Sequence, residues 1–380
     1  MSIIKHRKLR YQADILPLEP IGGTALVSAQ NNTEIVTCNS LDADIEEDMT
    51  QVIYYVSDIH IEHQIEVIGK PLPEAREMIL EKVNELVNTV DEDKGTILIA
   101  GDVADSIELT DIFYDELNQR MLQTANGSDW RIIAVLGNHE LWNASQRRWF
   151  KPNVNSIIRE YKKNVPVQLL ENELFVYYKG KNEYIIDEKT ILKANPDELT
   201  EFIMNSTLVI LGGIGFSGLN PIFNATNGLY RDVLTPKEDA DRTQRFSAVY
   251  DKVLKCAETK RVIVLTHTQM QNWSVKRYNP NWVYINGHTH QNTLIRSSDG
   301  TTVFSDNQIG YKPQKLKFKS FRMKGVYDLF DQWNDGIYRI TAEQYQDFNR
   351  ECGISMGDFK REGEIYAIKR YNTYMFFLKR

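Results

Sequence analysis

The sequence predicts an α/β fold, because short apolar segments alternate with helical patterns along the chain. Such segments, rich in Val, Ile and Leu and bounded by turn residues, are typical of buried strands. Six of them are evident: Val52–Val56, Thr96–Ala100, Arg131–Leu136, Leu208–Leu211, Arg261–Leu265 and Trp282–Asn286. The hydrophobic fraction of 42% is sufficient for the core that this fold needs.

Two helices between these strands can be placed from their own residues. The first follows Pro73, and its apolar residues recur every three or four positions to form one face: Ala75, Ile79, Val83, Leu86 and Val90. The second begins at the capping box Thr235-Pro236-Lys237-Glu238, in which proline occupies the first helical position. Its apolar face continues through Phe246, Val249, Val253 and Cys256.

The composition divides the chain into three parts. Residues 1–50 show no sustained hydrophobic period, so we predict an N-terminal extension whose structure the sequence leaves open. Residues 51–310 carry all the predicted strands and form the main domain. Residues 311–380 are rich in aromatic residues and lysine, and they predict a small α+β extension that caps this domain. Its elements would be a helix led by the capping box Thr341–Gln344 and a hairpin of Ile365–Lys369 with Tyr374–Leu378.

The bulk composition limits the partners and the compartment. A formal net charge of −7 provides no general attraction to duplex phosphates, so nucleic acid is a partner that is not favoured. The three cysteines are far apart and predict neither a disulfide framework nor a cysteine zinc site. No apolar run is long enough for a signal peptide or a membrane span. We therefore expect a cytoplasmic protein without membrane contact.

Polar side chains follow five of the six predicted strands, where each strand ends. Open α/β sheets bind their ligands at these carboxyl ends. Five of the seven histidines of the chain lie in these segments. The segments are Ser57-Asp58-Ile59-His60, Gly101-Asp102-Val103-Ala104-Asp105, Gly137-Asn138-His139-Glu140, Thr266-His267 and Gly287-His288-Thr289-His290.

The chemistry of these residues indicates a metal site. One such histidine alone would be read as a hydrogen-bonded loop residue, but five at equivalent positions, accompanied by Asp58, Asp102 and Asn138, favour metal binding. Imidazole nitrogens together with carboxylate and amide oxygens suit Mn, Fe, Zn or Co. Two such ions about 3.5–4 Å apart can hold a phosphoryl group and generate a hydroxide nucleophile near neutral pH. Asp102, flanked by Gly101, is the candidate to bridge them.

The order of the five motifs resembles that of the calcineurin-like metallophosphoesterases, over roughly residues 52–292. The resemblance implies a two-sheet β-sandwich flanked by helices, so that residues 51–310 would be a catalytic domain. It also implies how the ligands divide. One ion would be held by Asp58, His60, Asp102 and His290, and the other by Asp102, Asn138, His267 and His288. His139 would be the general acid, and Asp105 would orient its imidazole.

Substrate contacts are indicated more weakly. Arg147 and Arg148 open a basic stretch that could grip a phosphate backbone, although a solvated helix face is the commoner explanation. Tyr230 and Arg231 follow a glycine-rich strand exit and are further candidates. The aromatic and basic residues of the C-terminal extension could stack bases, but their density favours inward packing.

Three functions are compatible with these residues. We expect a phosphodiesterase that acts on a nucleotide-like small molecule. A nuclease acting on DNA or RNA is the alternative, because the basic stretch at 147–163 keeps it open. A non-catalytic metal-binding scaffold is less favoured, because a scaffold is free to lose ligands and here every ligand position and His139 are present.

Overall fold

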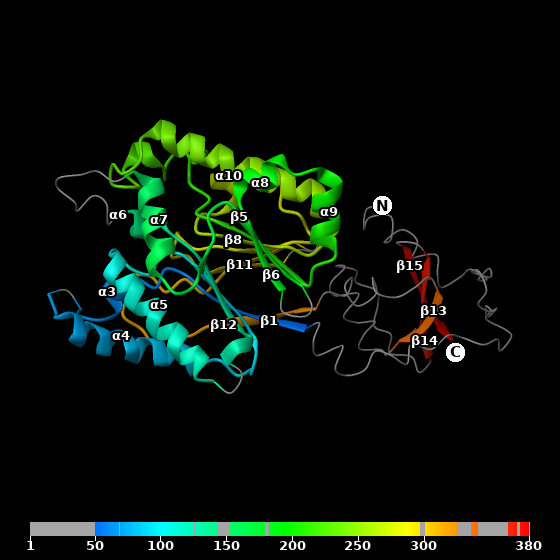
Figure 1. The fold of residues 1–380 in the computed structure, drawn as a ribbon, viewed down its shortest axis with the longest axis horizontal. Coiled ribbons are helices and arrows are strands. Elements are labelled where there is room, and N and C mark those ends of the chain that lie inside the picture. The colour runs from blue at the N-terminus through cyan, green and yellow to red at the C-terminus, as the bar shows by residue number, and fades with distance from the viewer. Residues whose placement is uncertain are drawn as a thin grey trace.

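The computed structural model describes residues 50–67, 69–124, 127–142, 153–178, 182–296, 301–324, 336–340, 364–370 and 373–379. Two large sheets pack face to face and carry helices on their outer sides (Figure 1). The predicted α/β class and the two-sheet sandwich are therefore confirmed. The N-terminal extension predicted for residues 1–50 lies, except for Thr50, outside the described residues.

The first sheet has five strands in the order β12-β1-β2-β3-β4. Strands β1 to β4 are parallel, whereas β12 is antiparallel to β1. Their bounds are β1 Thr50–Val56, β2 Gly95–Ala100, β3 Trp130–Val135, β4 Gln168–Leu169 and β12 Lys319–Lys324. The sequence predicted β1, β2 and β3 but not β4 or β12. Strand β12 lies beyond residue 310, where the predicted main domain ends.

The second sheet has seven strands in the order β10-β11-β9-β8-β7-β5-β6. Strands β6, β7, β8, β9 and β11 run in one direction, and β5 and β10 run in the other. Their bounds are β5 Glu173–Tyr178, β6 Asn182–Ile186, β7 Leu208–Gly213, β8 Ile263–Thr266, β9 Val283–Ile285, β10 Thr293–Arg296 and β11 Thr302–Ser305. The sequence predicted the central strands β7, β8 and β9.

Helices cover the outer face of each sheet. In Figure 1, α4 and α5 lie along one side of the sandwich, and α8, α9 and α10 lie along the other. The α-helices are α3 Ile61–Gln64, α4 Leu72–Val87, α5 Ile107–Leu122, α6 Asn138–Trp142, α7 Val154–Asn164, α8 Glu188–Lys193, α9 Pro196–Met204 and α10 Pro236–Ala257. Short 3₁₀ helices are η1 Gly127–Asp129, η3 Ala225–Asn227 and η4 Met270–Asn272. None of the described helices combines the length and apolar character needed to cross a membrane.

Both predicted helices form with the predicted buried face. In α4, the buried side chains are Ala75, Ile79, Val83 and Leu86. At the start of α10, the Thr235 hydroxyl accepts a hydrogen bond from the Glu238 backbone N–H, and the Glu238 carboxylate accepts one from the Thr235 N–H. The capping box satisfies backbone groups that the helix itself cannot pair.

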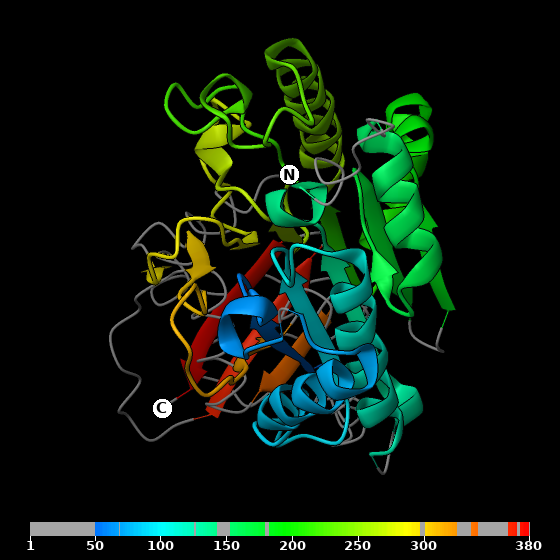
Figure 2. The same ribbon diagram turned by 90° about the vertical axis from the view of Figure 1, so that its left-hand side faces the viewer.

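The core between the two sheets determines where their strand ends lie. Along β1, Ile53 and Tyr55 face the second sheet, whereas Tyr54 and Val56 face α4 and α5. This alternation is the normal consequence of the strand's two-residue period. Because the parallel strands of both sheets are layered against one core, their carboxyl ends open on one side of the molecule. Figure 2 shows that side, with α3 and α6 toward the viewer.

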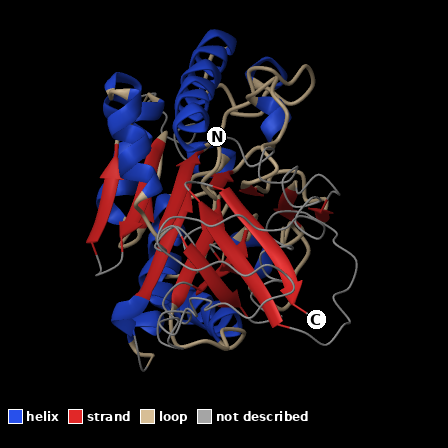
Figure 3. Ribbon diagram, turned by 90° about the vertical axis from the view of Figure 1, so that its right-hand side faces the viewer, coloured by secondary structure: helices blue, strands red, loops and turns tan. Residues whose placement is uncertain are grey.

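A third, antiparallel sheet has the order β13-β14-β15 (Figure 3). Its strands are β13 Gly336–Ile340, β14 Glu364–Arg370 and β15 Thr373–Lys379. The pair β14 and β15 confirms the predicted hairpin, with Ile368 opposite Met375. Strand β13 was not predicted. The helix expected after Thr341 lies outside the described residues.

Candidate metal centre

The five motifs meet at the carboxyl ends of strands from both sheets. Strands β1, β2 and β3 deliver Asp58, Asp102 and Asn138, and β8 and β9 deliver the histidines of the second sheet. Nitrogen and oxygen atoms of these side chains form compact groups, each with its members within 4.8 Å of one another. The groups relevant to the prediction are Asp58 with His60 and His290, and Asp102 with His267 and His288.

The backbone at five predicted ligands adopts a left-handed conformation. The φ angles are 53° at Asp58, 47° at His60, 54° at Asp102, 75° at His288 and 53° at His290. This region costs a non-glycine residue of order 1–3 kcal/mol and persists where the surroundings enforce it, often at functional sites. The strain turns each side chain away from the strand direction and toward the common centre.

Two glycines allow the loops to approach the carboxylates closely. A Cβ atom on Gly137 would lie 2.1 Å from the Asp102 Oδ1, and one on Gly287 would lie 2.2 Å from the Asp58 Oδ2. Neither distance is compatible with a side chain. The glycines of the GNHE and GHTH motifs are therefore required by packing against the predicted ligands.

The first group joins β1 to the loop after β9. The Nε2 atoms of His60 and His290 lie 3.0 Å apart, and the His290 Nε2 lies 3.4 Å from the Asp58 Oδ1. Asp58 and His60 are fully buried. The buried Nδ1 of His60 has no hydrogen-bond partner among the described residues. Two imidazole nitrogens that face each other beside a buried carboxylate form a donor set suited to a divalent cation.

The second group is centred on Asn138. Its Oδ1 lies 2.9 Å from the His267 Nε2 and 3.0 Å from the His288 Nδ1. The Asp102 Oδ2 lies 3.2 Å from the His267 Nε2 and 3.8 Å from the His60 Nε2 of the first group. One oxygen of Asp102 therefore lies between the two groups, where a bridging carboxylate must lie.

Charges inside the site set the protonation of its groups. Burial by itself would raise the pKa of Asp102, but the charges of His267 and His139 hold that pKa well below its usual range. Burial would lower the pKa of His267, but Asp102 raises it to about 9. Burial and the neighbouring His267 charge lower the pKa of His288 to about 4. An ionised carboxylate and a neutral imidazole are the forms that bind metals, and a cation would replace the His267 proton.

His139 lies beside both groups, and it forms a third compact group with His60, Glu62 and Asp105. Its backbone N–H donates to the Asp102 Oδ1 at 2.9 Å. Its Nδ1 lies 2.5 Å from the Asp105 Oδ1, and its Nε2 lies 3.1 Å from the Tyr311 hydroxyl. Burial would lower the pKa of His139, but Asp102 and Asp105 raise it. The structure therefore brings His139 and Asp105 together in the arrangement that the resemblance implies.

Glu140 connects the loops that carry Asp102 and Asn138. Its buried carboxylate accepts hydrogen bonds from the backbone N–H groups of Asp102, Val103 and Gly137, at 3.1, 2.6 and 2.7 Å. Burial raises the pKa of Glu140 to about 7. These three bonds hold the second and third motifs in a common position.

Of the predicted substrate residues, Arg231 reaches the site. Its guanidinium carbon lies 3.5 Å above the Trp142 ring, and its Nη1 lies 4.0 Å from the Asp105 Oδ2. The Trp142 ring also lies against the His139 ring, and the two ring centroids are 3.5 Å apart. The Trp142 Nε1 donates to the Leu229 carbonyl at 2.8 Å, which links this stack to the loop that carries Arg231.

Of the other predicted substrate residues, Tyr230 is buried instead of open to a substrate. Tyr230 is 1% exposed, its ring packs against Phe216, and its hydroxyl lies 3.3 Å from the Ser217 Oγ. A substrate at the histidines would not reach this side chain. Arg147 and Arg148 lie outside the described residues.

Sequence reasoning missed Tyr311, which lies over the histidines. It follows Gly310 and belongs to the predicted C-terminal extension, so no strand-end signal marks it. Its ring centroid lies 4.6 Å from that of His60, 4.7 Å from that of His63 and 4.5 Å from that of His290. Trp142 was also missed, although it follows the third motif by only two residues.

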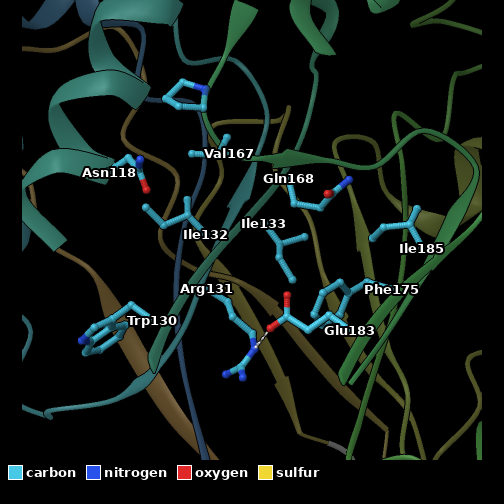
Figure 4. Close-up of a pocket in the computed structure, with 11 residues that line it drawn as sticks. Asn118, Trp130, Arg131, Ile132, Ile133, Val167, Gln168, Phe175, Glu183 and Ile185 are labelled. Atoms are coloured by element: carbon cyan, nitrogen blue, oxygen red, sulfur yellow. Dashed lines mark hydrogen bonds and ion pairs between the residues drawn. The ribbon is translucent and has the colours of Figure 1, made fainter. Parts of the chain in front are cut away.

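A cavity of about 460 Å³ lies at the opposite ends of the strands (Figure 4). It is lined by residues of β3 and of β5 and β6, including Trp130, Phe175 and Ile185. The Arg131 Nε donates to the Glu183 carboxylate at 2.6 Å across it (Figure 4). None of its lining residues belongs to the five motifs, so this cavity is separate from the site.

The chain was compared with curated proteins and with solved structures. No curated protein matches the chain. Among solved structures, phosphopantetheinyl hydrolase from Mycobacterium tuberculosis aligns at 16% identity over 72% of this chain and 96% of its own, with a TM-score of 0.41. A 5'-nucleotidase from Candida albicans SC5314 aligns at 13% identity over 79% of this chain and 58% of its own, with a TM-score of 0.31.

The family profile described as calcineurin-like phosphoesterase matches residues 52–292, the span over which the motifs carry the resemblance. This span is more than half of the 380 residues. The chain therefore belongs to the calcineurin-like phosphoesterase family and is a metal-dependent hydrolase of phosphate esters.

Proposed function

We propose that the protein is a phosphodiesterase that uses two divalent metal ions and acts on a nucleotide-like small molecule. The position of Asp102 carries the two-ion part of this proposal. One of its carboxylate oxygens lies 3.2 Å from the His267 Nε2 and 3.8 Å from the His60 Nε2, which belong to different groups of donors. A carboxylate so placed is suited to be shared by two ions.

The donors divide between two ions as the family resemblance implies. Asp58, His60, Asp102 and His290 would hold one ion, and Asp102, Asn138, His267 and His288 would hold the other. Nitrogen and oxygen donors in this mixture favour Mn, Fe, Zn or Co, and manganese is our first choice for loading. When bound, such ions neutralise charge on the phosphoryl group and lower the pKa of bound water.

The chain itself would supply the proton for the leaving group. The Asp105 carboxylate is hydrogen-bonded to the His139 Nδ1 and leaves Nε2 as the nitrogen that can address a substrate. Asp105 thereby fixes both the tautomer and the orientation of the imidazole. His139 would give its Nε2 proton to the departing oxygen, as a general acid does.

Charge near the site supports a small anionic substrate over a polynucleotide. Arg231 is half-exposed beside His139 and can pair with a phosphate oxygen. On α7, the basic residue Lys162 is already paired with Glu173 at 2.6 Å. The net charge of −7 also disfavours a polyanion. A cytoplasmic location remains part of this proposal.

The test combines metal analysis with a substrate panel. Purified, manganese-loaded protein is assayed on bis(p-nitrophenyl) phosphate, p-nitrophenyl phosphate, cyclic nucleotides and single-stranded DNA. We expect about two ions per chain and the highest kcat/KM on a small diester, lost on chelation and restored by Mn²⁺. A preference for monoesters or for DNA would contradict the proposed substrate class.

Asp102→Asn tests the shared ligand directly. Metal content should fall at both positions, because one carboxylate would serve both ions. The matched control is Asp239→Asn, a carboxylate that is equally buried and that accepts backbone hydrogen bonds from Ser217 and Ala225 away from the site. The control should keep its metal. One ion still bound at full occupancy in Asp102→Asn would show that Asp102 is not shared.

A further inference from the structure

Tyr311 lies at the boundary between the histidines and the solvent. Its side chain is half-exposed, and its ring lies within 4.7 Å, centroid to centroid, of the rings of His60, His63 and His290. Tyr311 is therefore a side chain that a substrate at these histidines can contact. Arg231 and Trp142 border His139 on another side.

The hydroxyl of Tyr311 lies next to the nitrogen that a leaving-group oxygen must approach. It is 3.1 Å from the His139 Nε2, and the Nδ1 of the same ring is occupied by Asp105 at 2.5 Å. An oxygen that receives a proton from Nε2 must lie within hydrogen-bond distance of it. An oxygen that approaches Nε2 from the side of Tyr311 is then within reach of the Tyr311 hydroxyl as well.

The backbone holds Tyr311 in this place through the loop after β1, which carries Asp58 and His60. The Gly310 N–H donates to the Asp58 carbonyl at 2.8 Å, and the Ile309 N–H donates to the Ser57 carbonyl at 3.1 Å. The Gln64 side chain donates to the Gly310 carbonyl at 2.7 Å. Gly310 has a φ of 77°, a conformation that favours glycine and turns the chain toward the site. These hydrogen bonds fix the position of the backbone next to Tyr311 relative to the predicted ligands.

We propose that Tyr311 is a catalytic residue whose hydroxyl donates a hydrogen bond to the leaving-group oxygen. This role rests on the proposed function. In the step, the bond from phosphorus to the leaving oxygen breaks and its electron pair goes to that oxygen. The oxygen takes the Nε2 proton of His139, while Tyr311 keeps its own proton. The attacking water gives its oxygen to phosphorus and a proton to the solvent, from which His139 is protonated again.

The variant Tyr311→Phe removes the hydroxyl and keeps the ring. For a cyclic nucleotide, whose leaving group is a ribose hydroxyl, kcat should fall about 10- to 100-fold, since hydrogen bonds to developing charge are strong. For bis(p-nitrophenyl) phosphate, whose leaving group needs little protonation, kcat should change less than about threefold. KM should stay constant for both substrates.

The matched control is Tyr184→Phe. Tyr184 lies in β6, is as exposed as Tyr311 (46% against 47%), and contacts Tyr178 and Phe202 instead of the site. This variant should leave both activities unchanged. An equal loss on both substrates in Tyr311→Phe, or no loss on either, would overturn the catalytic role.

A spectroscopic measurement tests the contact without any reaction. In ¹⁵N NMR spectra of the metal-free protein, Tyr311→Phe should shift the His139 Nε2 resonance, and Tyr184→Phe should not. An unshifted resonance would overturn the proposal. If the shift is present but the wild-type protein hydrolyses neither ester, the proposed function fails, and the catalytic role fails with it. If the wild-type protein is active and Tyr311→Phe is equally active, only the catalytic role of Tyr311 is contradicted.

Discussion

Among the buried histidines of the centre, His139 differs in what its ring nitrogens contact. The nitrogens of His267 lie near the Ala100 carbonyl and the Asn138 Oδ1, which leaves Nε2 directed at the other predicted ligands. His139 instead directs Nδ1 at Asp105 and Nε2 at Tyr311, and its Nε2 is 3.8 Å from the Asp102 Oδ2. The contact of Nδ1 with Asp105 is the observation that agrees with a proton donor at His139, the role that the family resemblance implies.

Replacing His139 should separate catalysis from metal binding. In His139→Asn, both ions should remain, and turnover of a substrate with a ribose leaving group should fall about 10²- to 10⁴-fold. The loss should be small for p-nitrophenolate. Asp105→Asn should give a weaker loss of the same kind, because it would only misorient the imidazole. Metal analysis and kcat for the two leaving groups measure this, and loss of a metal in His139→Asn would identify the residue as a ligand.

At the scale of elements, the strand-to-helix turns determine the site. The turn from β3 to α6 contains Gly137, Asn138 and Glu140, and Glu140 binds the backbone of the turn that follows β2. Two turns that are distant in the sequence are thus held as one unit. The two turns contact each other at Gly137, where a Cβ atom would lie against the Asp102 side chain.

Gly137→Ala should therefore damage metal binding more than folding. The added Cβ would lie 2.1 Å from the Asp102 Oδ1, so the carboxylate or the turn must shift. We expect lower occupancy at both metal positions, measured on protein that still unfolds cooperatively. The control is Gly69→Ala, where φ is 80° but no atom lies within 4 Å, so that the cost is backbone strain of about 1–2 kcal/mol with full metal content. Equal metal content in both variants would contradict the packing argument.

Elements were predicted best where burial makes their pattern continuous. Strands β1, β2, β3, β7, β8 and β9 are central and apolar, and the sequence predicted each of them. Strands β6 and β10 lie at sheet edges with exposed side chains, and β4 has only two residues, so none has a distinct pattern. Strand β12 forms by pairing with the free edge of β1. This pairing depends on the tertiary structure and not on a local sequence pattern.

For the whole molecule, we expect Glu171 to couple pH to stability. It lies between β4 of the first sheet and β5 of the second, and its carboxylate accepts a hydrogen bond from the Ile214 N–H at 3.3 Å. Burial raises the pKa of Glu171 from 4.5 to about 7. The folded state then binds this proton more tightly than the unfolded state, so the contribution is complete below pH 4.5 and is lost as the pH rises through about 7.

Glu171→Gln should remove this dependence. The free energy of unfolding of the wild-type protein, measured in urea, should fall relative to that of the variant as the pH rises from about 5 to 8. Glu198→Gln, at an exposed position in the first turn of α9, serves as the control and should follow the wild-type curve. Parallel curves for wild type and Glu171→Gln would show that Glu171 titrates normally in the folded protein.

The sequence by itself determined the fold class and the family, and it predicted the chemistry and the donors of the site. It could do so because the donor types and the buried strands that precede them are local properties, and parallel strands bring their carboxyl ends together in any such sheet.

Tertiary structure alone decided which further residues meet these donors. Tyr311 reaches His139 across 172 positions, because the chain from Asn307 onward runs beside β1. Arg231 reaches Trp142 because a loop folds back over α6. No local pattern encodes these approaches, since they depend on the order of strands in a sheet and on the path of loops between them.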